Sequence, residues 1–268
     1  MSHFAVAVLT REGQEVDDLL APYMENCCAQ PDYKYMEFYD GIEMHAEEYA
    51  KESTERVKMP DGRLLAPWDD EFMVPGEFGY GSGTHKVPDE LERVRVPFRE
   101  LYPDITEFLS KWHGMELDDA TGRYGYWQNP NAKWDWYVVG GRWERWAEET
   151  IGGVYVPVDE IAFDADAARE KAERWWAKNM DVDGKPSNAM AALSWNQLDH
   201  DRYVEGASHF SMRAVITPDG EWHEVGNMGW WGMSSETADD MYDWEMHFEE
   251  RFLEPNRDCT LTVVDCHI

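Results

Sequence analysis

The sequence predicts an α+β fold: a mixed, mainly antiparallel sheet with helices packed on one face. Two observations support this. Apolar, β-type runs open and close the chain, SHFAVAVLT at residues 2–10 and TLTVVDCHI at residues 260–268, and helical and hairpin patterns alternate between them. A ferredoxin-like kernel with insertions is one arrangement that fits this order. We expect a single α+β domain over residues 1–268, with residues 37–90 forming a peripheral acidic helix and an irregular insertion.

The first half of the chain predicts helices separated by a loop-rich stretch. Residues 14–24 fit a short helix. Residues 37–58 are acidic, with aromatic and apolar side chains at helical spacing, which predicts a solvated amphipathic helix on which His45 is a surface or packing residue. Residues 59–88 are rich in Pro and Gly and should be mostly irregular. A further helix should begin near Pro103-Asp104.

The second half predicts two long helices and a hairpin. Residues 159–178 form the clearest helix, with acids early and bases late, and residues 180–207 are interpreted as a connector. Residues 210–217 and 221–225 flank Pro-Asp-Gly and predict a hairpin. A helix should then run from Ser234 or Ser235 to about Leu253 and bury a stripe made of Met241, Trp244, Phe248 and Phe252.

The charge balance narrows the function classes. The chain has 55 acidic and 24 basic residues, a formal net charge of −31. Broad nucleic-acid binding is not expected, because such proteins neutralise phosphates with clustered Lys and Arg. The acidic charge either keeps the chain soluble or lets it imitate nucleic acid or bind a basic protein. No signal peptide, CxxC pair or membrane-spanning apolar run is found in the sequence, so a cytoplasmic protein with reduced thiols is expected.

Residues 123–146, RYGYWQNPNAKWDWYVVGGRWERW, combine indoles with cations in an otherwise acidic chain. We interpret them as a turn, a strand over residues 134–139, a bend at Gly140-Gly141 and a second aromatic-basic segment. Aromatic faces beside guanidinium groups can bind an anionic, aromatic ligand. Alternatively, the aromatic residues are core and the arginines pair with nearby acids. The candidate ligand-binding residues are Lys133, Trp134, Trp136, Tyr137, Arg142, Trp143, Arg145, Arg213 and, in a second glycine-aromatic segment, Trp230 and Trp231.

A second candidate site lies at one end of the predicted sheet. If the first and last strands pair antiparallel, His3 lies near His267, and Asp265 shares a face with His267. His209 would join them if its strand runs parallel to the first. These four residues are candidate catalytic residues, because a His/His/Asp group suffices for a metal site or for acid–base chemistry. The alternative is ordinary hydrogen bonding, and the sequence leaves cofactors and metal content open.

Several segments resemble a family of uncharacterised proteins encoded by tailed bacteriophages. They are SHFAVAVLT with LAPYMEN at residues 20–26, RYGYWQNPNAKWDWYVVGGRW, TPDGEWHEVGNMGWWG and LTVVDCHI. The resemblance implies a phage accessory protein in the bacterial host cytoplasm and assigns no catalytic residues. Two functions then compete. The protein binds, or also cleaves, a small nucleotide-like ligand such as a bacterial immune signal and so counters host defence; or it is an acidic inhibitor or DNA mimic that docks on a host protein. Whether it is an enzyme, and its oligomeric state, stay open.

Overall fold

The computed structural model describes residues 3–25, 34–74, 83–194, 198–226 and 235–268, and the chain divides into two compact units. Unit 1 comprises Met1–Tyr35 and Asn129–Ile268, and unit 2 comprises Met36–Gln128. The predicted α+β class, with mixed and mostly antiparallel sheets, is confirmed. The division differs from the expected single domain, because the insertion runs past residue 90 and has buried cores of its own.

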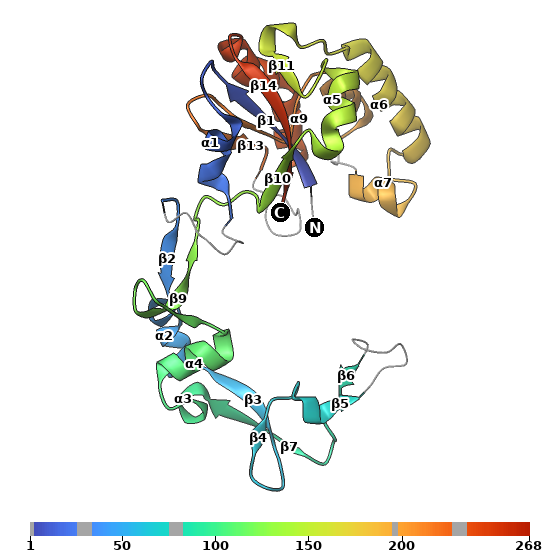
Figure 1. The fold of residues 1–268 in the computed structure, drawn as a ribbon. Coiled ribbons are helices and arrows are strands. Elements are labelled where there is room, and N and C mark those ends of the chain that lie inside the picture. Colours follow the sequence, from blue (N-terminus) through green and yellow to red (C-terminus); the bar gives the residue numbers. More distant parts are fainter. Residues whose placement is uncertain (1–2, 26–33, 75–82, 195–197, 227–234) are drawn as a thin grey trace. The chain divides into compact units, whose positions relative to one another are not determined.

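Unit 1 is built on one sheet in which strands from both ends of the chain are central (Figure 1). The strand order is β10-β14-β1-β12-β13, and β11 pairs with β14 beyond the end of β10. The bounds are β1 His3–Thr10, β10 Trp136–Val139, β11 Tyr155–Pro157, β12 Ala214–Ile216, β13 Trp222–Glu224 and β14 Thr260–His267.

The prediction that the first and last strands are adjacent and central is confirmed. β1 and β14 pair antiparallel along their whole length, from His3 opposite His267 to Thr10 opposite Thr260. Both strands are largely buried on both faces, which is the pattern of a strand covered from two sides. The expected hairpin is also present, as β12 and β13, but it is shorter than predicted.

The kernel of this sheet is not ferredoxin-like. In a ferredoxin-like sheet the second strand of the hairpin lies beside the first strand of the chain. Here the first strand of the hairpin, β12, pairs parallel with β1, and β13 is the outer strand. The parallel pairing requires a crossover between β1 and β12. The helices between residues 16 and 207 lie within that long connection, whereas the C-terminal helical segment lies between β13 and β14.

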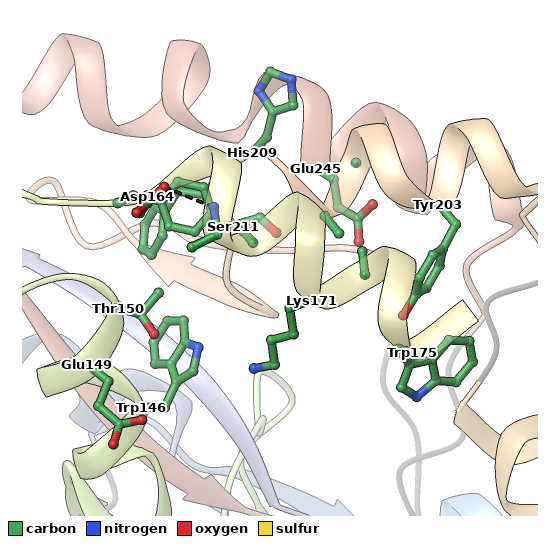
Figure 2. Close-up of a pocket in the computed structure, with 17 residues that line it drawn as sticks. Trp146, Glu149, Thr150, Asp164, Lys171, Trp175, Tyr203, His209, Ser211 and Glu245 are labelled. Carbon is green, nitrogen blue, oxygen red and sulfur yellow. Dashed lines mark hydrogen bonds between the residues drawn. The ribbon is translucent and has the colours of Figure 1, made fainter. Parts of the chain in front are cut away.

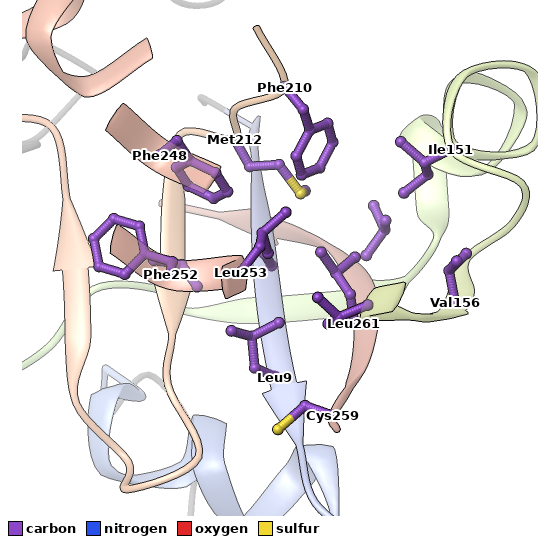
Figure 3. Packing of buried hydrophobic residues seen from close by; sticks show 14 of the residues in the cluster. Leu9, Ile151, Val156, Phe210, Met212, Phe248, Phe252, Leu253, Cys259 and Leu261 are labelled. Carbon is purple, nitrogen blue, oxygen red and sulfur yellow. The ribbon is translucent and has the colours of Figure 1, made fainter. Parts of the chain in front are cut away.

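Helices cover the sheet mainly on one face, where the larger core lies. Figure 3 shows Phe248, Phe252 and Leu253 from the C-terminal helical segment packed with Leu9 and Leu261 from the central strands. The other face is covered by the short helix α1 and by Trp134 and Trp222, so the helices are not confined to one face. The bounds in unit 1 are α1 Val16–Leu20, α5 Glu144–Thr150, α6 Ala165–Asn179, α7 Ala189–Ser194, α8 His200–Ala207 and α9 Ala238–Phe248. Single helical turns are η1 Ala21–Tyr23, η3 Gly141–Trp143, η4 Val158–Glu160, η6 Glu249–Leu253 and η7 Glu254–Asn256.

Capping side chains set the starts of α6, α8 and α9. Asp164 accepts a hydrogen bond from the Ala167 amide, so α6 begins at Ala165 and not at residue 159 as predicted. Thr237 and Asp240 form a capping box at the start of α9. Residues 180–207 are not a simple connector, because they contain α7 and α8, the latter capped by Asp199.

Unit 2 contains small antiparallel sheets and, within its described residues, the helices α2, α3 and α4. Its sheets have the orders β2-β9-β8, β4-β3-β7 and β5-β6. The bounds are β2 Glu37–Asp40, α2 Gly41–Lys51, β3 Ser53–Lys58, β4 Leu64–Leu65, η2 Asp70–Phe72, β5 Met73–Val74, β6 Thr84–His85, β7 Glu92–Pro97, α3 Phe98–Leu101, α4 Ile105–His113, β8 Glu116–Asp118 and β9 Arg123–Gln128. The helix predicted to begin near Asp104 is confirmed as α4, with Asp104 as its cap.

The single acidic helix predicted over residues 37–58 is wrong. Asp40 ends β2 and caps α2 by accepting hydrogen bonds from two amides of its first turn, and α2 ends at Lys51. The alternating segment that follows forms β3, in which Thr54 and Arg56 are buried. The Arg56 guanidinium lies over the rings of Trp68 and Trp112. Residues 59–74 and 83–88 carry only short strands and one helical turn, as expected for a mostly irregular stretch.

None of the helices in the described ranges is both long enough and apolar enough to cross a bilayer.

Candidate functional site

The predicted histidine group at the sheet end is assembled by β1 and β14. Nδ1 of His3 lies 2.9 Å from Oδ1 of Asp265, and the Asp265 side chain is 4% exposed. The other oxygen of Asp265, Oδ2, accepts a 3.1 Å hydrogen bond from the backbone amide of Arg142. A Cβ atom at Gly141 would lie 2.5 Å from Cβ of Asp265, so glycine at this position lets the bend approach the carboxylate.

His267 is held by a different carboxylate. Its Nδ1 lies 2.7 Å from Oδ1 of Asp135, and its side chain is buried. The Trp136 indole stacks on the His267 ring, with centroids 4.8 Å apart and 16° between the planes. His3 meets the same imidazole edge-on at 5.0 Å. Each imidazole therefore has its own carboxylate partner.

This arrangement is that of two hydrogen-bonded pairs. His3, Asp265 and His267 do not bring three ligand atoms within 4.8 Å of one another, although another group of described residues does. His209 lies elsewhere: β12 does run parallel to β1, but it begins at Ala214, and His209 lies in the turn after α8 and lines a separate cavity. These contacts are ordinary hydrogen bonds, which was the alternative to a metal or acid–base site in the sequence analysis.

The cations predicted to meet a ligand are paired with acids. Nζ of Lys133 lies 2.6 Å from the buried Glu224 carboxylate, and Arg213 forms a two-pronged contact with Glu236 at 2.7 and 3.2 Å. Nε of Arg145 lies 2.7 Å from Glu149, on an exposed helix face. Arg142 pairs with Asp265 through Nε at 3.7 Å, and not with Asp135 or Glu144, the acids nearest to it in the sequence.

The aromatic residues of the same segment divide between core and surface. Trp134 is buried against α1, and Trp143 packs at the margin of the larger core. Tyr137 donates a hydrogen bond to Asp17, and burial raises the pKa of its phenol. Among the predicted ligand-binding aromatic residues that the structure describes, Trp136 alone is exposed, at 43%. Trp230 and Trp231 lie outside the described residues.

Residues 123–146 do not act as one structural segment. The boundary between the two units falls between Gln128 and Asn129, so RYGYWQ forms β9 of unit 2 and the remainder belongs to unit 1. Of this segment, Trp146 lines the cavity described next. Arg142, one of the predicted ligand-binding residues, does not line that cavity.

That cavity has a volume of about 410 Å³ and lies in unit 1 among α5, α6, α8 and α9 (Figure 2). Five aromatic residues from different elements form much of its wall, and the Trp175 and Tyr203 rings lie 5.1 Å apart. Small residues of α6 and α8 complete the wall. The aromatic residues are Trp146, Phe163, Trp175, Tyr203 and Phe210.

The ionisable groups of the cavity leave one cation unpaired. Glu149 is paired with Arg145, and Asp164 accepts the capping hydrogen bond of α6. Lys171, from the middle of α6, makes no ion pair or hydrogen bond with any residue that the structure describes. The His209 side chain likewise has no hydrogen-bond partner among those residues. The cavity therefore offers a free ammonium and a free imidazole beside aromatic surface.

Glu245 is the most perturbed acid of this cavity. Burial raises the pKa of its carboxyl to about 7, because removing the carboxylate from water disfavours the charged form. A Cβ atom at Gly206 would collide with Oε2 of Glu245, so this glycine makes room for the carboxyl. The negative charge of Glu245 also contributes, after burial, to raising the pKa of Tyr203. Because this pKa is raised, the protonated carboxyl is populated nearer to neutral pH than for an ordinary glutamate and can donate a proton.

Sequence reasoning missed this cavity because its residues come from four separate helices and a turn. The sequence does contain one indication of α8: Asp199, a residue type favoured as a helix N-cap, directly precedes HDRYVEGA. Without α8, His209 was assigned to a strand and Tyr203 to a connector.

No family model, no curated protein and no solved structure matches this chain.

Proposed function

We propose that the protein binds a small aromatic, anionic molecule of nucleotide-like chemistry in the cavity of unit 1. The observation that carries the proposal is that five aromatic side chains line the cavity beside the ammonium of Lys171. Among the described residues, no acid forms an ion pair with Lys171. Ring stacking on indole or phenol and a charge-assisted hydrogen bond from an ammonium are the usual means of holding such a ligand. The volume of about 410 Å³ lies within the usual range for small-molecule sites.

The acids of the cavity do not oppose this assignment. Glu149 and Asp164 already have partners, and the raised pKa of Glu245 removes part of its negative charge near pH 7. The net charge of −31 repels anions at long range, but salt screens it beyond about 8 Å at physiological ionic strength. The local cation then decides the binding.

Glu245 also supports a hydrolytic version of the proposal. A carboxyl whose pKa is raised to about 7 can give a proton to a leaving oxygen, which is general acid catalysis. In the setting that the resemblance to phage proteins implies, the ligand would be a nucleotide signal of bacterial immunity, and its capture or cleavage would counter host defence.

The test is a thermal-shift and native-mass screen of the full chain against cyclic dinucleotides, ADP-ribose derivatives and dNTPs. A ligand at 100 times its Kd should stabilise the protein by about 2.7 kcal/mol. Lys171→Ala should reduce this stabilisation, whereas Lys178→Ala, the matched control on the same helix but outside the cavity, should not. Equal binding by both variants would place the ligand elsewhere.

Cleavage is tested separately with Glu245→Gln. This variant keeps the size of the side chain but cannot supply the proton, so turnover should fall by about 10²–10⁴-fold while binding persists. Turnover that survives the substitution would remove Glu245 from the mechanism and leave the binding proposal intact.

The second candidate function, an acidic inhibitor or DNA mimic, is favoured by the charge alone: 55 acidic against 24 basic residues. Its partner would be a basic host protein, and the complex should weaken steeply with added salt. A purified host protein that normally binds nucleic acid serves as the test partner. If its affinity for this chain does not change with salt concentration, charge mimicry is contradicted.

A further inference from the structure

We propose that unit 2 binds a divalent transition-metal ion, best matched to Zn²⁺, through His45, Glu48 and His113. Nδ1 of His45 and Nε2 of His113 each lie 3.0 Å from the same atom, Oε2 of Glu48. One ligand atom from each residue falls within 4.8 Å of the other two. Tetrahedral ligands about 2.0–2.1 Å from zinc lie about 3.3 Å apart, so the side chains are close to the spacing that one ion needs.

Two helices build this group. His45 and Glu48 are three residues apart on α2, which places them on one face of the helix. His113 is the last residue of α4, and Gly114, with φ of 67°, ends that helix immediately after it. A Cβ atom at Gly41 would lie 2.5 Å from the sulfur of Met115, so glycine permits the close approach of the first turn of α2.

The surroundings hold the ligands in place. The imidazoles of His45 and His113 stack with centroids 3.7 Å apart and 27° between planes, and the Phe108 ring meets His113 edge-on at 5.0 Å. The three side chains are 19%, 32% and 21% exposed in sequence order. They are thus shielded but not sealed, as an exchangeable ion requires.

The donor set selects the metal. Two imidazoles and one carboxylate suit zinc and neighbouring transition metals, whereas Ca²⁺ and Mg²⁺ prefer oxygen ligands throughout. A hollow of about 530 Å³ is lined by both histidines together with Gly114, Gly125 and Tyr126. Glu48 does not line this hollow, so of the three ligands only the two histidines border it. With three protein ligands, a fourth position stays open for water or a small ligand, which distinguishes the site from a closed structural one.

The experiment titrates ZnCl₂ into the full chain after dialysis against EDTA, with calorimetry for affinity and elemental analysis for stoichiometry. We expect one zinc ion per chain. His45→Gln, Glu48→Gln and His113→Gln should each weaken binding by at least about 100-fold, because loss of a ligand costs no less than loss of an outer-shell partner. His200→Gln is the matched control. Nε2 of His200 contacts Glu173 and Nδ1 contacts Asp201, so the two carboxylates lie at different ring nitrogens and do not share one metal position with His200.

Unfolding curves separate loss of metal from loss of fold. In EDTA the three ligand variants should unfold as cooperatively as the wild type. Zinc should raise the Tm of the wild type and of His200→Gln but not that of the three ligand variants. Lys171→Ala should bind zinc normally, because its cavity belongs to unit 1. Zinc binding that persists in all three variants, or a stoichiometry near zero, would overturn the site and leave the trio as an ordinary hydrogen-bonded group.

Discussion

The imidazole of His3 is tied to the carboxylate of Asp265, with 2.9 Å between Nδ1 and Oδ1. This contact joins the first described residue of β1 to a buried acid near the end of β14. Because the second oxygen of Asp265 accepts a hydrogen bond from the Arg142 amide, one carboxylate contacts both the start of β1 and the glycine bend after β10. The sheet end is organised around Asp265.

The first prediction follows from that arrangement. Asp265→Ala should lower the free energy of unfolding by about 2–4 kcal/mol, because it strands the Arg142 amide and one nitrogen of His3. Arg142→Ala should cost less than about 1 kcal/mol, since its side chain is 56% exposed and its Nε lies 3.7 Å from Asp265. Denaturant unfolding of the two variants measures both values. If both variants lose the same free energy of unfolding, the Arg142 guanidinium contributes more to stability than an exposed ion pair should.

Glycine at position 141 is required for close approach as well as for its backbone conformation. Gly141 has φ of 50° and Gly184 has φ of 70°, so an alanine at either position pays a left-handed strain of about 1–2 kcal/mol. Only at Gly141 would the new Cβ atom also meet the Asp265 side chain, adding about 1–3 kcal/mol of overpacking. Thermal unfolding should therefore show Gly141→Ala as clearly less stable than Gly184→Ala. The close-approach argument fails if the two variants unfold together.

Glu245 should make stability depend on pH. Its pKa is about 7 in the folded protein and near 4.5 when unfolded, so the folded state holds the proton more tightly. This contribution to stability is fully present below about pH 4.5, falls as pH rises toward 7, and is lost above it; the change is at most about 3 kcal/mol. In Glu245→Gln that part of the pH dependence should disappear. Parallel stability–pH curves for wild type and variant between pH 4.5 and 7.5 would contradict the buried-acid assignment.

Lys133 should prove to be a structural cation. Its ammonium is 2.6 Å from Glu224, whose side chain is 6% exposed, so Lys133→Ala leaves a buried carboxylate unpaired. We expect a loss of about 2–3 kcal/mol after allowance for the partly exposed lysine, with unchanged affinity for any ligand of the unit 1 cavity. Replacing Glu224 by Gln in the same background should recover part of the loss. A variant of normal stability and reduced ligand affinity would return Lys133 to the binding site.

Local patterns predicted the parts of the fold that depend on neighbours in sequence. Local sequence patterns predicted three features: the apolar strands at residues 3–10 and 260–267, the Pro-Asp-Gly hairpin and the Asp104 cap. Strand burial, turn formation and helix capping each depend on a few neighbouring residues. The segments misread over 37–58 and 180–207 have the opposite character: each contains a cap, Asp40 or Asp199, inside a stretch that was treated as uniform.

By itself, the sequence determined the α+β class and the two central strands, because burial shows in a local apolar run. It placed His3 near His267 only on the condition of antiparallel pairing, and the structure supplied that direction and register. Only the tertiary structure decided which acid each cation meets. Arg142 pairs with Asp265, 123 residues away, and Lys133 with Glu224, 91 residues away. It also brought Lys171 and Glu245 to one cavity and His113 to Glu48. The physical reason is that these pairings depend on how distant elements pack, and a local pattern of charge or apolarity carries no record of its distant partner.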